Sequence, residues 1–154
     1  MGTKAIIASG IPAFAFIPPA IAQGEFLNSG KVVRGDLPFP EAVRQDQVLY
    51  LSGQVGLDPA SQKLVAGGTG AQTRQTMENI ETVLQAHDYT LTDVIRCTVY
   101  LVDMAEFAEF NGVCAGYFQK GSYPTRSTVA ERGLAMGAKV EVECMAYGCQ
   151  VRAA

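Results

Sequence analysis

The chain alternates between β-rich runs and amphipathic helical segments, and this order constrains its fold more than any other feature. Runs rich in β-branched and aromatic residues predict strands at 48–56, 94–102, 127–131 and 139–151. Apolar residues at helical spacing predict helices at 71–87 and 103–118, between the first three of these strands. One or two further strands are expected before residue 48. This order predicts an α+β fold in which both helices cover one face of a sheet.

The last predicted strand has two chemically different faces. One face carries Val140, Val142, Cys144 and Ala146, and the other carries Lys139, Glu141, Glu143 and Met145. We expect the helices to cover the first face. Other strands place leucine and tyrosine on the second face, which is therefore partly apolar. Because an uncovered surface of this kind usually meets a partner, the sequence predicts a homo-oligomer.

Length and composition indicate one globular domain. The chain has 154 residues, of which 48% are hydrophobic and 18% are charged. A chain of this length buries roughly two-thirds of its unfolded surface. The net charge is −3, and the 12 lysines and arginines are scattered along the sequence. Nucleic acids and acidic membranes select basic patches, so neither is an expected partner.

The cysteines and the single histidine indicate neither a metal site nor a disulfide framework. No Cys-x-x-Cys pair occurs among the four cysteines, which are Cys97, Cys114, Cys144 and Cys149. His87 is the only histidine, so both residue types argue against a structural zinc site. Buried, inert thiols are expected in the strands and on the second helix. Cys144 and Cys149 would face opposite sides of one strand and could not bridge. His87 lies near a helix end and is expected to cap that helix or interact with its dipole.

Residues 1–22 have the features of a secretory signal. Lys4 precedes an uncharged stretch that ends in the small-x-small sequence Ala20-Ile21-Ala22, and three prolines argue against a membrane-spanning helix. Cleavage would leave a domain at 23–154, in the periplasm or secreted, where the cysteines would meet an oxidising compartment. The alternative is an N-terminal extension that is retained, in which case the protein is expected in the cytoplasm.

Arg126 and Glu141 are the residues that are most informative about the reaction that the protein could catalyse. A guanidinium is a planar, permanently charged fork that grips a carboxylate through two parallel hydrogen bonds. A nearby glutamate can accept a proton or direct a water molecule. Together they indicate small-molecule chemistry on a substrate that carries a carboxylate. The structural alternative is a surface ion pair between neighbouring strands.

Four stretches of the sequence resemble one known family. They read Leu-Tyr-Leu-Ser-Gly-Gln at 49–54, Thr-Arg-Gln-Thr-Met-Glu-Asn-Ile at 73–80, Pro-Thr-Arg-Ser at 124–127 and Val-Glu-Val-Glu at 140–143. In this order and spacing they resemble the RidA (YjgF-like) enamine/imine deaminases. The resemblance implies a chorismate-mutase-like protomer with a mixed sheet, and a homotrimer with a central barrel and three clefts between subunits. It also implies hydrolysis of 2-iminopropanoate and 2-iminobutanoate to 2-keto acids and ammonia, without a cofactor or a metal.

The resemblance assigns roles to individual residues. Arg126 matches the arginine that clamps the substrate carboxylate, and Glu141 matches the glutamate that positions or activates water. Ser52, before the Gly-Gln pair, and Asn111, on the second helix, match residues that face the cleft. Without the resemblance, Ser52 would be interpreted as a turn hydroxyl and Asn111 as a surface residue.

Two positions depart from the pattern of the family. Phe39 stands where the family has a tyrosine, so a phenolic hydroxyl is lost, and Thr128 replaces a frequent cysteine, which removes a nucleophile. Both residues are expected to line the substrate site. The departures leave open a second interpretation, a non-catalytic or chaperone-like member that binds small carboxylates. The resemblance also allows a ribonuclease activity, but the net negative charge of the chain disfavours RNA cleavage.

Overall fold

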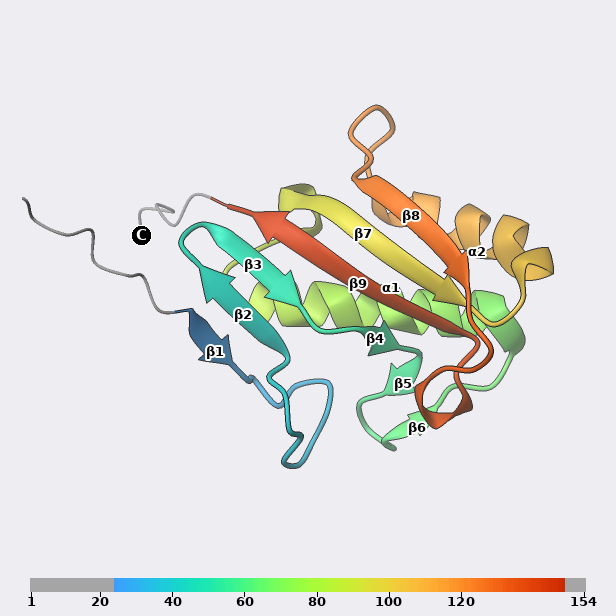
Figure 1. The fold of residues 1–154 in the computed structure, drawn as a ribbon, viewed down its shortest axis with the longest axis horizontal. Helices are drawn as coiled ribbons and strands as arrows, with labels where there is room; N and C mark the ends of the chain where they lie inside the picture. The colour runs from blue at the N-terminus through green and yellow to red at the C-terminus, as the bar shows by residue number, and fades with distance from the viewer. Residues whose placement is uncertain (1–23, 149–154) are drawn as a thin grey trace, which may run out of the picture.

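The computed structural model describes residues 24–148, so the predicted signal at 1–22 and Cys149 lie outside the described part (Figure 1). The main sheet contains β1 (Glu25–Leu27), β2 (Ala42–Gln45), β3 (Val48–Leu51), β4 (Gln54–Val55), β7 (Val94–Leu101), β8 (Thr125–Ala130) and β9 (Val140–Tyr147). The strands lie in the order β1-β2-β3-β9-β7-β8, and β4 also pairs with β9. Strands β7 and β8 are parallel and the other pairs are antiparallel, so the sheet is mixed. A small separate hairpin joins β5 (Leu57–Asp58) to β6 (Lys63–Leu64).

Both predicted helices form, and both lie behind the sheet in Figure 1. The first, α1 (Gly68–Ala86), ends at His87, which is its C-cap as expected. The second, α2 (Phe107–Cys114), is shorter than predicted because 3-10 turns at Met104–Glu106 and Ala115–Tyr117 flank it. Asp103 caps this region, since its carboxylate accepts a hydrogen bond from the amide of Ala105 at 2.8 Å. No helix within residues 24–148 has the length and apolar character needed to cross a membrane.

The core lies between the sheet and the helices. Met77, Ile80 and Leu84 form the predicted apolar stripe of α1 and are completely buried. Strand β9 shows the predicted alternation, with Val140, Val142, Cys144 and Ala146 buried and the intervening residues facing away from the helices. Tyr50 and Tyr147 are exposed, so the uncovered face of the sheet is partly apolar, as expected.

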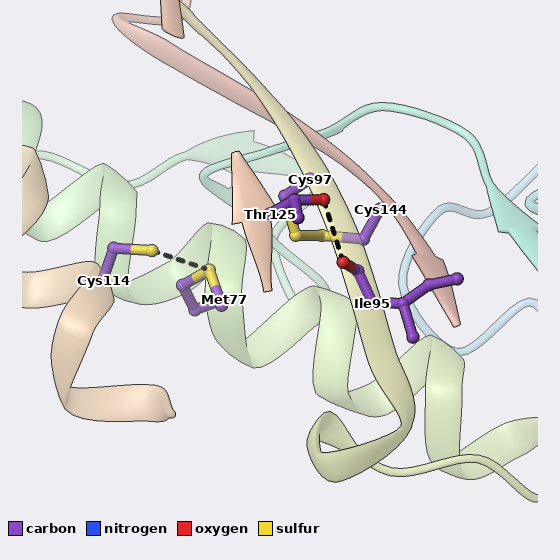
Figure 2. The surroundings of a disulfide bond; sticks show 6 residues. All are labelled: Met77, Ile95, Cys97, Cys114, Thr125 and Cys144. Carbon is purple, nitrogen blue, oxygen red and sulfur yellow. Dashed lines mark hydrogen bonds between the residues drawn. A yellow bond between two sulfur atoms is a disulfide. The ribbon is translucent and has the colours of Figure 1, made fainter. Parts of the chain in front are cut away.

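The structure contradicts one expectation about the cysteines. Cys97 and Cys144 form a disulfide between β7 and β9, and they are not inert thiols (Figure 2). The two residues lie directly opposite each other in the strand register, with their Cα atoms 4.2 Å apart. Sequence spacing could not reveal this bond because it depends on which strands become neighbours. Cys114 is a free, buried thiol, as predicted.

Candidate functional site

A cavity of about 440 Å³ opens beside Glu141, and we call it the Glu141 cavity. Its walls come from the connection between β1 and β2, from the turn between β3 and β4, and from a 3-10 turn at Ala135–Gly137. Ser52, Phe39 and Glu141 all line it, so three of the predicted site residues lie together.

The carboxylate of Glu141 lies directly against the backbone of Gly53. A β-carbon at position 53 would overlap the Oε1 and Cδ atoms of Glu141, so only glycine leaves room for the side chain. Burial raises the pKa of Glu141 above its ordinary value, and the neighbouring charge of Glu143 raises it further. The carboxyl group is therefore a stronger proton acceptor, when ionised, than an exposed glutamate.

Ser52 helps to hold the wall of this cavity. Its hydroxyl donates a hydrogen bond to the carbonyl of Pro40 at 2.7 Å, and its amide donates to the carbonyl of Glu41 at 2.9 Å. The hydroxyl thus has a structural partner, which is the role expected of a turn residue. It also lies at the cavity surface, where it can accept a further hydrogen bond.

A buried pair supports the same wall from behind. Nε2 of His87 donates to Oε1 of Glu41 at 2.7 Å, and the side chains are only 9% and 10% exposed. The same Oε1 atom accepts a hydrogen bond from the amide of Ser29 at 2.6 Å. His87 therefore does more than cap α1, because it ties the helix to the segment that encloses the cavity.

Arg126 lines a second cavity, also of about 440 Å³, which we call the Arg126 cavity. One guanidinium nitrogen donates a hydrogen bond to Oδ1 of Asn111 at 2.6 Å. The guanidinium carbon lies 5.7 Å and 5.6 Å from the ring centres of Phe107 and Phe110, a cation–π distance. Asn111 and Arg126 thus lie together in this cavity. Desolvation raises the pKa of the Cys114 thiol in the same cavity, so it is a poor nucleophile.

Thr128 lies two residues after Arg126 on β8, and it pairs with Val99 in the parallel register. It therefore points to the same side of the sheet as Arg126. It is partly buried, and it is not among the residues that line either cavity.

Arg126 and Glu141 do not meet within one copy of the chain. Arg126 is paired with Cys97, and Glu141 is paired with Tyr100. Cys97 and Tyr100 are three residues apart on β7, so their side chains, and those of their partners, point to opposite faces. The alternative of a surface ion pair on neighbouring strands is therefore wrong, because β7 lies between β8 and β9.

The two cavities carry opposite charge. Asp36, Glu41 and Glu141 line the Glu141 cavity, and no lysine or arginine is among its described lining residues. Arg126 lines the other cavity, where the residues described include no carboxylate. Each cavity has one of the two groups expected in a site for a carboxylate substrate.

Several residues of the Glu141 cavity were not predicted as site residues. Gln54 is buried and lines the cavity, and Gly53 makes room for Glu141. The Ser-Gly-Gln sequence carried a signal for both, since a glycine inside a strand often marks a close approach. Met136 also lines the cavity, with a left-handed backbone at φ 59°. No local pattern in the sequence indicated it.

Comparison with known proteins places this architecture in one family. The family model described as Endoribonuclease L-PSP matches residues 34–148. A RutC family protein of Pyrococcus horikoshii is 41% identical over 110 residues, covering 71% of this chain and 86% of the relative. The 2-iminobutanoate/2-iminopropanoate deaminase of Bos taurus is 39% identical over 122 residues, covering 79% and 88%.

Solved structures show the same fold. The crystal structure of E. coli TdcF with bound serine has a TM-score of 0.75 and 26% identity, and the match covers 81% of this chain and 99% of that one. The mixed sheet and the two helices agree with the fold of this family. The chain therefore belongs to the endoribonuclease L-PSP family, the RidA (YjgF) family that its sequence resembles.

Proposed function

We propose that the protein hydrolyses 2-imino acids and their enamine tautomers, such as 2-iminopropanoate and 2-iminobutanoate, to 2-keto acids and ammonia. The observation that carries this proposal is the division of charge between the two cavities. A 2-imino acid has a carboxylate that needs a cation and an imine carbon that needs an activated water. The chain has one cavity with each group, on opposite faces of its sheet.

The two halves can meet only between copies of the chain. The proposed assembly is a homotrimer with a central barrel and a chorismate-mutase-like protomer, in which the partly apolar faces with Tyr50 and Tyr147 are covered. Arg126 of one subunit then faces Glu141 of the next subunit across a cleft. Each subunit contributes to two clefts, and each cleft is complete only when two subunits meet.

The reaction follows from these groups. Arg126 holds the substrate carboxylate through its guanidinium fork. Glu141 accepts a proton as a water molecule adds to the carbon of the C=N bond, and it returns that proton to the nitrogen. In the resulting carbinolamine the hydroxyl proton passes to the nitrogen by the same route, the C–N bond breaks, ammonia leaves and the C=O bond of the keto acid forms. Positioning and one general base supply a rate enhancement of about 10²–10⁴-fold, and no covalent intermediate is needed.

Arg126→Lys tests this proposal directly. Lysine keeps the positive charge and loses the fork, so we expect a large loss of imine hydrolysis with the oligomer unchanged. The 2-iminopropanoate is generated enzymatically, its decay is followed with and without the protein, and light scattering reports the oligomeric state. Wild-type turnover in the lysine variant would refute the role of Arg126.

A second candidate function is non-catalytic binding of small carboxylates. Phe39 favours it, because the ring lines the Glu141 cavity without the phenolic hydroxyl of the family pattern. In that case 2-keto acids bind, Arg126→Ala abolishes the binding, and the decay of 2-iminopropanoate has the same rate with and without the protein. The imine assay therefore distinguishes the two candidates. A chaperone-like role would instead leave client aggregation suppressed in Arg126→Ala.

We also propose that the protein is exported. The Cys97–Cys144 disulfide needs an oxidising compartment, and residues 1–22 have the charge and apolar pattern of a cleaved signal. N-terminal sequencing of the natural protein should begin at Gln23. A natural protein that retains residues 1–22 and carries free thiols at 97 and 144 would contradict export.

A further inference from the structure

We propose that the Glu141 cavity selects 2-imino acids with a large apolar side chain, such as the imine with the leucine carbon skeleton, over 2-iminopropanoate. This inference rests on the proposed function and extends it to the class of substrate. The cavity places apolar side chains beyond the catalytic carboxylate, and Met136 is the residue at its rim that makes the selection.

The size of the cavity is the first observation. Its volume of about 440 Å³ lies within the range of roughly 300–1,000 Å³ in which proteins hold drug-sized ligands. The methyl group of 2-iminopropanoate would leave most of this volume to water. Water against apolar walls is unfavourable, so a substrate that replaces it binds more tightly.

The chemistry of the walls is the second observation. The polar groups near the reacting centre, Ser52, Gln54 and Glu141, come from the turn between β3 and β4, from β4, and from β9. The remaining wall carries the polar side chains Asn28, Asp36 and Glu41 and a larger apolar set from the connection between β1 and β2 and from the 3-10 turn: Val32, Val33, Leu37, Phe39 and Met136. A substrate whose imine carbon lies at Glu141 can therefore extend an apolar group toward side chains of matching character.

Met136 is the third and most specific observation. Its side chain is 63% exposed, yet its backbone is held in the left-handed region at φ 59°, which is unfavourable for a residue other than glycine. Residues with a strained backbone cluster at binding sites, where the surrounding structure holds them in that conformation. A methionine is flexible and polarisable, so it can adapt to apolar groups of different shape.

The expected preference can be estimated from apolar burial. Each buried methylene group strengthens binding about fourfold. The leucine-derived imine has three more carbons than 2-iminopropanoate, so we expect its kcat/KM to be higher by at least roughly tenfold, since burial in an open cavity is incomplete.

The test compares two imines in the full-length protein. A D-amino-acid oxidase generates them from D-alanine and D-leucine, and semicarbazide traps the imine that remains. Met136→Asn replaces the apolar side chain with a polar one that tolerates the left-handed backbone. Met104→Asn is the matched control, because Met104 is 45% exposed and lies outside the cavity. Calorimetry with pyruvate and 4-methyl-2-oxopentanoate measures the same preference in binding.

We expect the wild type and Met104→Asn to prefer the leucine-derived imine and the larger keto acid. Met136→Asn should lower the ratio of the two kcat/KM values severalfold. If both imines are hydrolysed with no preference for the larger, or if Met136→Asn leaves the ratio unchanged, this inference is wrong and the proposed function stands. If neither imine is hydrolysed faster than in buffer, both are wrong.

Discussion

The Glu141 cavity and the Arg126 cavity differ in charge and in how the chain builds them. Half of the residues that line the Arg126 cavity come from β7, β8 and α2, and the others come from β9, from the 3-10 turn after α2 and from the segment before β8. Its guanidinium is fixed by Asn111 and two aromatic rings. The Glu141 cavity is enclosed largely by connecting segments, with glycines and exposed apolar side chains. A carboxylate is the same in every 2-imino acid, whereas the side chain varies. Under the proposed function, the Arg126 cavity, as the rigid half, therefore suits the constant part of the substrate, and the Glu141 cavity, as the adaptable half, suits the variable part.

Subunit complementation tests whether the two cavities form one cleft between subunits, and it has the largest expected effect. Arg126→Ala and Glu141→Ala should each lower kcat/KM by about 10²–10⁴-fold, because each removes one half of every cleft. Co-expression of the two variants should restore about a quarter of the wild-type activity, since random assembly pairs an intact arginine with an intact glutamate in that fraction of clefts. The coupled imine assay on purified mixed oligomers measures this. Failure of the mixture to exceed either variant would contradict a cleft that is shared between two subunits.

Gly53→Ala changes only the Glu141 cavity and tests whether activity depends on the position of the Glu141 carboxylate. The added β-carbon overlaps the carboxylate of Glu141, so Glu141 must move, and we expect kcat/KM to fall by roughly 10–100-fold. Binding of the keto acid carboxylate should change much less, because Arg126 is untouched. Gly112→Ala on α2 is the control, since a β-carbon there meets nothing within 4 Å. If Gly112→Ala lowers kcat/KM as much as Gly53→Ala does, the loss does not depend on the contact between position 53 and Glu141.

His87→Ala tests what holds the adaptable half in place. Loss of the imidazole removes a buried hydrogen bond to Glu41, so we expect the free energy of unfolding to fall by about 2 kcal/mol. Glu25→Gln is the control, because the Glu25–Arg44 pair is largely exposed on the glutamate side and should contribute less than about 1 kcal/mol. Urea denaturation of both variants provides the measurement. Similar values for the two would mean that the His87–Glu41 pair does not stabilise the wall.

The pH profile gives the smallest and most specific test. The base must be ionised, so kcat/KM should fall as the pH decreases through the pKa of Glu141. Burial and Glu143 raise that pKa, so the fall begins at a higher pH than for an ordinary glutamate. Glu143→Gln removes the smaller cause and should move the midpoint to lower pH. Glu81→Gln on the surface of α1 should not move it. A midpoint that rises in Glu143→Gln would contradict the assignment of the base.

Much of the fold could be predicted from the sequence because local patterns determined it. The apolar stripe of α1 and the alternation along β9 each reflect one element and its buried face. The Cys97–Cys144 bond and the opposite orientation of Arg126 and Glu141 could not be predicted from local patterns, because both depend on β7 lying between β8 and β9. The unusual backbone of Met136 is set by the loop around it, and the residue type gives no sign of it.

The hydrogen bond from Arg126 to Asn111 has a consequence for the kinetics of capture. A long side chain normally loses rotational freedom when it first grips an anion, and that loss weakens the complex. Here folding has already restricted the guanidinium between an amide and two rings. The guanidinium is thus already oriented when an anion binds to it. We expect Asn111→Ala to lower the association rate of the anion, although the variant keeps every charge.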